Sequence, residues 1–390
     1  MKKKLKSMLK TLIIVMLALS LTGCWNRREL NTLAIVMGVG IDKGEKPDEI
    51  EMSVQIVDTS SMKSGSKGGD SGGSSAYINL TGTGTNPISI LRNFTHEISR
   101  KLYIPHNQMI IFGNGLAKDG VHDSLDMFLR DHEARLTVNV FVAKGEAKAI
   151  FKAKPELAKI PTADLSLRSE IQGATSETAS LTVMDFMTCL ASKTHSAVAP
   201  IVDIKENEGK KIAIISGGAV FKADKVVGEL DKTETRGFLW VTNKVKSGVL
   251  CVGIKGEKAD LEIVKSTTDV TAEIKKDGTI HFKVKVKESG GIATQTGSEN
   301  FGKTENIKLI EKAADELIKQ EIKSSIKQAQ SLDSDIFGFG EMLHSKYPKQ
   351  WKTLEGDWDN AFKNINVDIE VEAKIVSAGR LAKPDYPTEE

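Results

Sequence analysis

The ten residues LAIVMGVGID, at positions 33–42, decide the fold of this chain. Nine of them carry no polar side chain, and the run ends at Asp42. A short apolar run of this length, closed by a polar residue, is typical of a strand buried in a sheet. Residues 50–56 follow with apolar side chains at every second position, the pattern of a strand with one buried face. The folded part of the chain therefore begins with two strands of a sheet.

Helices and strands alternate after this pair. Asn86 and Pro87 open a helix whose apolar side chains share one face, because proline is favoured in the first turn. The other elements expected here are strands at residues 76–80, 108–112 and 136–142, and a helix at residues 121–129. This alternation predicts a mixed sheet covered by helices.

The second half of the chain is richer in strands. Asp277 and Gly278 form a turn between alternating segments at residues 261–274 and 280–286, which is a strong signal for a hairpin. A long amphipathic helix is expected at about residues 305–328. The remaining expected elements are helices at residues 162–171, 181–190 and 231–241, and strands at residues 211–215, 217–221, 226–228, 249–254 and 367–376.

The first 24 residues have the organisation of a bacterial lipoprotein signal. Five lysines precede residue 11, and residues 12–21 are apolar apart from one serine, as in a secretory signal. This run of ten residues is too short for a membrane-spanning helix, which needs about 20. The sequence then resembles the bacterial lipobox at Leu21, Thr22, Gly23 and Cys24. In such a box the small residues admit the chain to a peptidase, and the thiol receives a diacylglyceryl group.

We therefore expect cleavage of a signal peptide at residues 1–23 and attachment of lipid to Cys24. Two acyl chains anchor a protein stably, so the mature protein should stay at the extracytoplasmic face of a membrane. Cleavage changes the formal net charge from +2 to −3, because the lost segment holds five lysines and no acid. Nucleic acid is not an expected partner, since no Lys/Arg stripe is interleaved with aromatic residues.

The mature chain is long enough for several domains. It retains 367 of the 390 residues, and single cores usually stop growing at about 250–300. We expect an α+β protein of three domains, at residues 24–198, 199–260 and 261–390, with mostly antiparallel or mixed sheets covered by helices. Ala199 and Pro200 mark the first boundary. Residues 59–75 are rich in Ser, Gly and Lys and predict a flexible loop in the first domain.

Cysteines and histidines indicate no metal or cofactor. Once Cys24 carries lipid, only Cys189 and Cys251 remain, too few for a paired-cysteine metal site. A disulfide between these two cysteines is one alternative, but we favour the other, in which both are buried as small apolar side chains. The histidines lack the close pairing of a zinc site.

Two stretches match enzyme motifs but lack the required context. Residues 69–73 surround Ser71 as in serine hydrolases, but this serine lies in the Gly/Ser-rich segment and has no strand before it. Residues 297–304 fit the phosphate-loop pattern, but the strand expected before them ends at about residue 286. We interpret them as a turn in which Thr304 caps the long helix, and we expect no enzymatic activity.

Three stretches form an ordered set across the mature chain. The first is residues 24–43, beginning Cys-Trp-Asn-Arg-Arg-Glu-Leu-Asn, and the second is residues 234–240, Glu-Thr-Arg-Gly-Phe-Leu-Trp. The third is Asp-Ile-Phe-Gly-Phe-Gly at residues 335–340, followed by Pro348, Trp351, Trp358 and Gly379. The set resembles the Ger(x)C family, the lipoprotein or C subunit of the nutrient germinant receptors of endospore-forming bacteria. Asn26 departs from the aspartate that is commoner in the family.

This resemblance implies a non-enzymatic α+β protein on the outer face of the spore inner membrane, without a cofactor. It implies two protein partners, a membrane-embedded A subunit and a transporter-like B subunit. The cue to be detected would be a small nutrient such as an amino acid or a sugar.

The motif residues have separate interpretations. Trp25, Arg27 and Arg28 either lie at the lipid headgroups, next to the anchor, or pack against the first domain. Seven others, Glu234, Arg236, Gly237, Phe337, Gly338, Gly340 and Trp351, are interpreted as structural, in tight turns and buried packing. Direct contact with a partner is the less favoured interpretation.

Two other functions compete with a receptor subunit. A solute-binding lipoprotein of an ABC importer would share the signal and the size, but its usual form is two α/β lobes around a cleft. A lipid-anchored nucleotide hydrolase would use residues 297–304.

Overall fold

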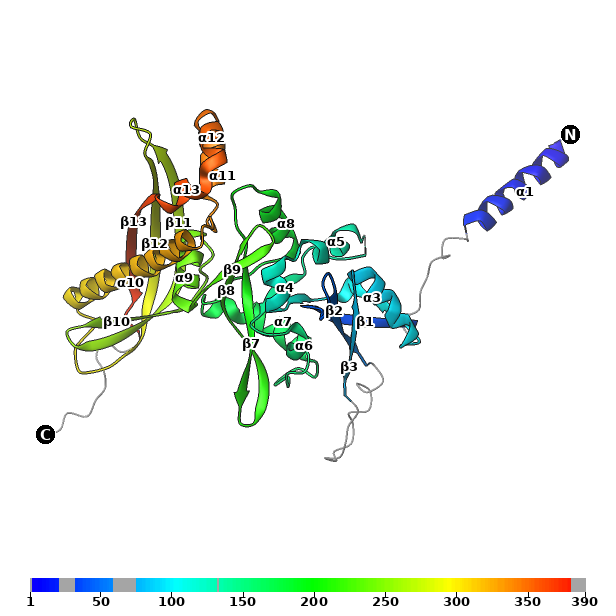
Figure 1. Ribbon diagram of the computed structural model, residues 1–390, viewed down its shortest axis with the longest axis horizontal. Coiled ribbons are helices and arrows are strands. Elements are labelled where there is room, and N and C mark those ends of the chain that lie inside the picture. Colours follow the sequence, from blue (N-terminus) through cyan, green and yellow to red (C-terminus); the bar gives the residue numbers. More distant parts are fainter. Residues whose placement is uncertain (1, 21–31, 59–74, 132, 380–390) are drawn as a thin grey trace.

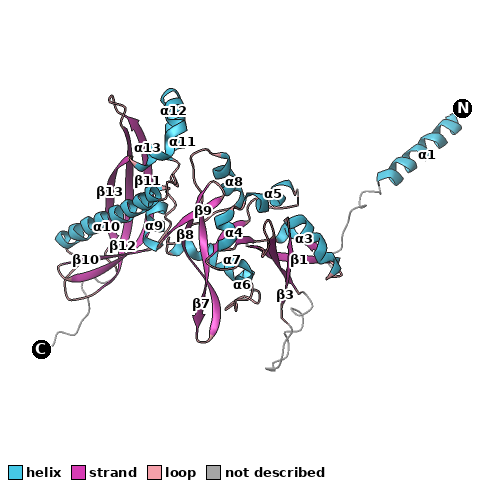
Figure 2. Cartoon of the chain, viewed as in Figure 1, coloured by secondary structure: helices cyan, strands magenta, loops and turns pink. Residues whose placement is uncertain are grey.

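The computed structural model describes residues 2–20, 32–58, 75–131 and 133–379. Figures 1 and 2 show two β-sheets with helices packed around and between them. Both sheets are mixed, which confirms the predicted α+β class.

The first sheet has nine strands in the order β3-β2-β1-β5-β6-β7-β8-β9, with β4 paired to β1. Its central strands β1, β5, β6 and β7 are parallel, and antiparallel strands flank them on both sides. The strands are β1 Leu33–Lys43, β2 Ile50–Val57, β3 Tyr77–Gly84, β4 Lys101–Tyr103, β5 Met109–Phe112, β6 Asn139–Ala143, β7 Val198–Asn207, β8 Lys210–Lys222 and β9 Lys225–Leu230. The apolar run at residues 33–42 thus lies at the centre of the sheet, as its composition predicts.

Strand β2 is more buried than its alternation predicts. Ser53 and Gln55 occupy its polar face, yet both are buried. The carboxamide of Gln55 donates to the carbonyl of Phe151 at 3.1 Å and accepts from the backbone and hydroxyl of Thr162 at 2.9 and 2.8 Å. A second layer therefore covers this face, and hydrogen bonds satisfy its polar groups.

Helices cover the first sheet on both faces. On one face, helices α3, α4, α5 and α8 contribute in turn Ile90, Leu116, Leu125 and Phe186 to a core with the strands. On the other, α6 and α7 contribute Ile150 and Leu165. The helices are α3 Pro87–Asn93, α4 Asn114–Asp119, α5 His122–Arg130, α6 Ala147–Ile150, α7 Pro161–Ile171 and α8 Val183–Ala191. Asn86 caps α3 by accepting from Ser89 N at 2.9 Å.

The second sheet has the order β10-β11-β12-β13. Its first three strands are antiparallel, and β13 is parallel to β12 because the chain crosses back through α10. The hairpin predicted around Asp277 and Gly278 joins β11 to β12. The elements are β10 Val249–Ile254, β11 Glu257–Ile274, β12 Ile280–Gln295, α10 Thr304–Ser331, α11 Phe339–Lys346, α12 Pro348–Leu354, α13 Trp358–Lys363 and β13 Asn366–Ser377.

Helix α9, Lys232–Val241, connects the two sheets. It follows β9 directly and packs against α10 of the second sheet (Figure 1). The buried core around it includes Val220 and Leu230 of the first sheet together with Phe282 of the second sheet and Ile318 of α10. One apolar core therefore runs across the junction between the sheets.

Several local predictions are wrong. Thr304 does not cap α10, because the cap position is Lys303 and no side chain bonds there. Cys251 is exposed, since it lies on the outer side of β10, and Cys189 is only partly buried; both thiols are free. Strand β12 continues to Gln295 instead of ending near residue 286. The segments predicted at residues 211–215 and 217–221 form the single strand β8.

The three-domain division stays a prediction. The strands of residues 199–260 are shared between the sheets, with β7, β8 and β9 in the first and β10 in the second. Ala199 and Pro200 lie within β7, where the pairing with β8 shifts register after Pro200. The predicted loop at residues 59–75 lies almost entirely outside the described residues.

Helix α1, Lys2–Ser20, occupies most of the predicted signal peptide. Within the described part of the chain, no helix is long and apolar enough to cross a membrane.

Candidate functional site

The second motif lies where α9 crosses α10. Nε of Arg236 donates to both carboxylate oxygens of Glu321, at 3.0 and 2.9 Å, and Nη2 also donates to this carboxylate. Trp240 Nε1 donates to the same group at 2.9 Å. Burial lowers the pKa of Arg236, but the hydrogen bonds and charge of Glu321 outweigh it and raise this pKa above its ordinary value. Glu321 is 1% exposed, so this ion pair is buried.

Glu234 and Gly237 serve the same crossing. Glu234 forms a capping box with Asp231, in which each backbone N–H donates to the other's carboxylate, at 2.9 and 2.7 Å. Burial raises the pKa of Glu234. A Cβ on Gly237 would lie 2.1 Å from the carbonyl oxygen of Glu321, so only glycine permits this approach of the two helices.

The third motif surrounds the carboxylate of Asp335. It accepts from the backbone N–H groups of Phe337, Phe339 and Gly340, at 3.2, 3.1 and 2.8 Å. The indole of Trp358 donates to it at 3.3 Å. Burial raises the pKa of Asp335 to about 6, although the three backbone donors act in the opposite direction. The tight turn requires Gly338, whose φ of +71° favours glycine.

Around this turn lie stacked aromatic rings and a contact with the first sheet. Phe339 stacks on Phe282 of β12 with ring centroids 4.1 Å apart. The rings of Trp351 and Trp358 are tilted against each other, with centroids 5.2 Å apart. Ser196, just before β7, donates its N–H to the carbonyl of Asp335 at 2.9 Å. The motif thus holds the second sheet against the first.

His195 and Glu321 are site residues that sequence reasoning missed. His195 Nδ1 lies 3.4 Å from a carboxylate oxygen of Glu341, beside the Asp335 turn. Glu321 had a signal in the sequence, because it lies three positions after Ile318 and so falls on the apolar stripe of α10. For His195 we find no such signal, since it lies in the irregular segment between α8 and β7.

The first motif is described only in part. Leu21, Thr22, Gly23, Cys24, Trp25, Arg27 and Arg28 lie outside the described residues, so their roles stay predictions. Near the end of the motif, Asp42 is 4% exposed and accepts from Ala147 N at 2.7 Å and Lys148 N at 3.0 Å. Asp42 thereby holds the start of α6 in place. Burial raises its pKa.

Residues 297–304 match the phosphate-loop pattern, but side chains of the protein itself already accept hydrogen bonds from their backbone N–H groups. Glu257 accepts from the N–H groups of Ser298 and Glu299, at 2.9 and 3.1 Å. Asn300 accepts from Gly302 N at 3.0 Å. A phosphate would need these donors, and an acidic side chain lies where its charge would be. Among the described residues, no group of three acidic, cysteine or histidine side chains is placed to hold a metal ion.

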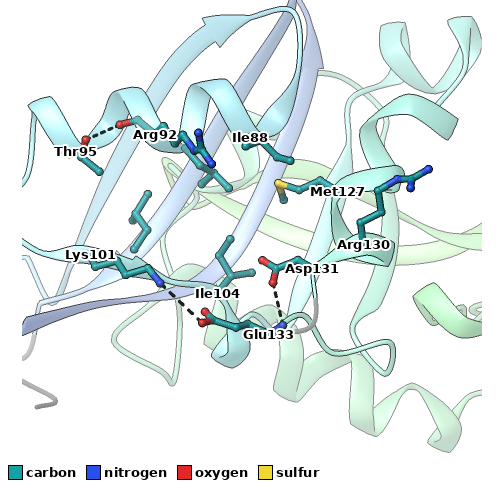
Figure 3. A pocket seen from close by; sticks show the side chains of 11 residues that line it. Ile88, Arg92, Thr95, Lys101, Ile104, Met127, Arg130, Asp131 and Glu133 are labelled. Atoms are coloured by element: carbon teal, nitrogen blue, oxygen red, sulfur yellow. Dashed lines mark hydrogen bonds and ion pairs between the residues drawn. The ribbon is translucent and has the colours of Figure 1, made fainter. Parts of the chain in front are cut away.

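A pocket of about 420 Å³ lies between α3, β4 and α5 (Figure 3). Ile88, Leu91, Leu102, Ile104 and Met127 form its apolar surface. Charged residues surround this surface, namely Arg92, Lys101, Arg130, Asp131 and Glu133. Figure 3 shows Lys101 extended toward Glu133 and the guanidinium of Arg130 directed away from the pocket. No local pattern in the sequence indicates this pocket, because three separate segments build it.

Two family models match the chain in order. The spore germination protein N-terminal domain matches residues 26–204, and the spore germination B3/GerAC-like C-terminal domain matches residues 216–379. The chain therefore belongs to this family of spore germination proteins. The match favours a germination protein over the solute-binding lipoprotein and the nucleotide hydrolase.

Relatives in Bacillus subtilis strain 168 match over nearly their whole length. Spore germination protein KC is 27% identical over 398 residues, which cover 96% of this chain and 97% of the relative. Spore germination protein YndF is 27% identical over 416 residues, covering 98% and 99%. The crystal structure of the GerBC protein is 21% identical and covers 87% of this chain and 97% of its own, with a TM-score of 0.58. This likeness shows that the fold is shared.

Proposed function

We propose that this chain is the non-enzymatic C subunit of a spore nutrient germinant receptor, tethered by lipid on Cys24 to the outer face of the spore inner membrane. The observation that carries the proposal is the ordered match of both family models across residues 26–379. The lipobox at residues 21–24 supports the tether. The partners are the membrane-embedded A and B subunits.

The geometry of the motif residues supports a scaffold without chemistry of its own. Catalysis requires side chains that can reach a substrate. Here the polar groups of Arg236 and Asp335 are occupied by buried protein partners, and Gly237 allows two helices to touch. These residues stabilise the junction between the sheets, which suits a subunit that acts by holding membrane partners in position.

The tether is tested directly on spores. Mass spectrometry of the protein from spore inner membranes should find a mature N-terminus at Cys24 that carries a diacylglyceryl thioether. A Cys24→Ala variant should lose this modification and germinate poorly with nutrients. Cys251→Ala is the matched control, because this thiol is exposed on β10 and should be dispensable. Normal nutrient germination of the Cys24→Ala spores would refute a functional role for the tether.

Partnership is tested separately from the tether. The wild-type chain should co-purify with the A and B subunits from spore inner membrane in a mild detergent. Absence of both subunits from the purified material would contradict the receptor assignment, whatever the state of Cys24.

A further inference from the structure

The pocket between α3, β4 and α5 lies close to the predicted anchor along the chain. Leu33, the first residue of β1, pairs with Lys101 on the rim of the pocket. Leu33 lies nine positions after Cys24, and an extended chain spans at most roughly 3.4 Å per residue, or about 31 Å in total. If Cys24 carries lipid, as proposed above, this rim lies within about 31 Å of the bilayer.

The surface of the pocket is apolar and partly open. Ile88 is 46% exposed, and Leu91 and Ile104 are half-buried beside the more deeply buried Leu102 and Met127. A volume of about 420 Å³ falls within the range of roughly 300–1,000 Å³ that small-molecule sites occupy. Its occupant should therefore present hydrocarbon to this surface.

The wall formed by α3 and β4 is basic. Residues 92–106 contain Arg92, Arg100 and Lys101 but one acid, Glu97. Within the described part of the chain, the guanidinium of Arg92 has neither an ion pair nor a hydrogen bond. Lys101 pairs with Glu133 at 3.8 Å, and both side chains are exposed. Such a long exposed pair is worth about 0–1 kcal/mol, so an incoming anion can replace it.

The opposite wall differs in charge. Arg130 is held by Asp126, through bonds of 2.9 and 2.7 Å from its Nε to the carboxylate. Asp131 and Glu133 are carboxylates, so this side accepts hydrogen bonds and repels anions. An occupant must therefore place its anionic group on the α3–β4 side and hydrogen-bond donors toward α5.

We propose that this pocket binds an anionic phospholipid of the bilayer, with a hydroxylated headgroup. Its phosphate lies between Arg92 and Lys101, its headgroup hydroxyls donate to Asp131 and Glu133, and its glycerol and first acyl methylenes cover the apolar surface. A single lipid tether leaves the orientation of a protein on the membrane free. A second contact at the pocket fixes which surface faces the membrane, and it binds at the high effective concentration that the tether supplies.

The test uses the whole chain, purified in a non-ionic detergent, with dihexanoyl phosphatidylglycerol below its micelle concentration. Hydrogen–deuterium exchange should show protection in peptides from residues 87–106 and 122–135. The double variant Arg92→Gln/Lys101→Gln should bind about 30-fold more weakly, since each basic residue near an anionic lipid contributes about a factor of five. Lys308→Gln/Lys312→Gln, which removes the same charge from the exposed side of α10, should bind as the wild type.

Four outcomes would overturn the proposal. The first is that phosphatidylglycerol gives no protection of the pocket peptides from exchange. The second and third are that dihexanoyl phosphatidylcholine, or inorganic phosphate alone, protects these peptides as well as phosphatidylglycerol does. The fourth is that both double variants bind phosphatidylglycerol equally weakly. The lipid is supplied in solution, so the experiment does not depend on the acylation of Cys24. A failure here is thus distinguishable from a failure of the tether, which mass spectrometry reports.

Discussion

Glu288 is a buried carboxyl whose ionisation should weaken the second sheet. It continues the inward face of β12 after Phe282, Val284 and Val286, and it is 2% exposed. Among the described residues, neither carboxylate oxygen has a hydrogen-bond partner. Burial and the nearby charge of Asp315 on α10 raise the pKa of Glu288 to about 7, from an ordinary value of 4.5. The folded protein therefore holds a proton that the unfolded chain releases.

The magnitude follows from the two pKa values. A pKa difference of one corresponds to about 1.4 kcal/mol, so a rise from 4.5 to about 7 corresponds to about 3 kcal/mol. Below pH 4.5 both states are protonated, and the burial of Glu288 carries no ionisation cost. Stability should fall as the pH rises from 4.5 to about 7, and above that the full cost remains.

A Glu288→Gln variant removes this titration while keeping the shape of the side chain. It should match the wild type near pH 4.5 and exceed its stability by up to about 3 kcal/mol at pH 8. Urea unfolding of both proteins at several pH values, followed by circular dichroism, measures the difference. The matched control is Glu370→Gln on the neighbouring strand β13, where the carboxylate is exposed and its pKa is lowered by a hydrogen bond from Lys283.

The outcome that contradicts this reasoning is a wild type and a Glu288→Gln variant with the same pH dependence. Lower stability of the variant at pH 8 would likewise show that the ionised carboxylate has a stabilising partner. A pH-dependent gain in Glu370→Gln would point to a general charge effect instead of burial at Glu288.

Two further substitutions test the crossing of α9 and α10. Gly237→Ala places a Cβ 2.1 Å from the carbonyl oxygen of Glu321, so α9 must shift; we expect a loss of about 2–4 kcal/mol in thermal or urea unfolding. Gly145→Ala is the control, because an added Cβ there has no atom within 4 Å, and it should leave the stability nearly unchanged. Arg236→Met leaves the carboxylate of Glu321 buried without its ion pair, and we expect a loss of about 3–5 kcal/mol. Adding Glu321→Met should recover much of that stability, and a double variant as unstable as the single one would refute the buried-charge argument.

The sequence predicts those elements whose pattern is local. The buried strand at residues 33–42, the hairpin around Asp277 and the long helix α10 all appear where periodicity places them. The missed elements β4, α4, α6, α11, α12 and α13 have three to eight residues each, too few to show a period. Residue spacing also could not reveal that β7 pairs in parallel with β6, across 54 residues of intervening chain.

The site residues show the same limit. The resemblance identified Arg236 and the turn at residues 335–340, but their partners come from distant segments. Glu321 lies 85 positions from Arg236, and Ser196 lies well before Asp335. The pocket beside α3 depends on three segments that only the folded sheet brings together. Side-chain type alone made none of these contacts visible.

The two described motifs act at one place, the junction between the sheets. At one side of the junction, Arg236 joins α9 to α10 through Glu321. Its Nη1 also lies 3.8 Å from a carboxylate oxygen of Glu177, which precedes α8. At the other, the turn at Asp335 bonds to Ser196 before β7. Because the apolar core continues through this junction, the second sheet moves with the first instead of swinging on a linker. If the proposed lipid contact at the pocket beside α3 fixes the orientation of the first sheet, it therefore fixes the orientation of β10 to β13 as well.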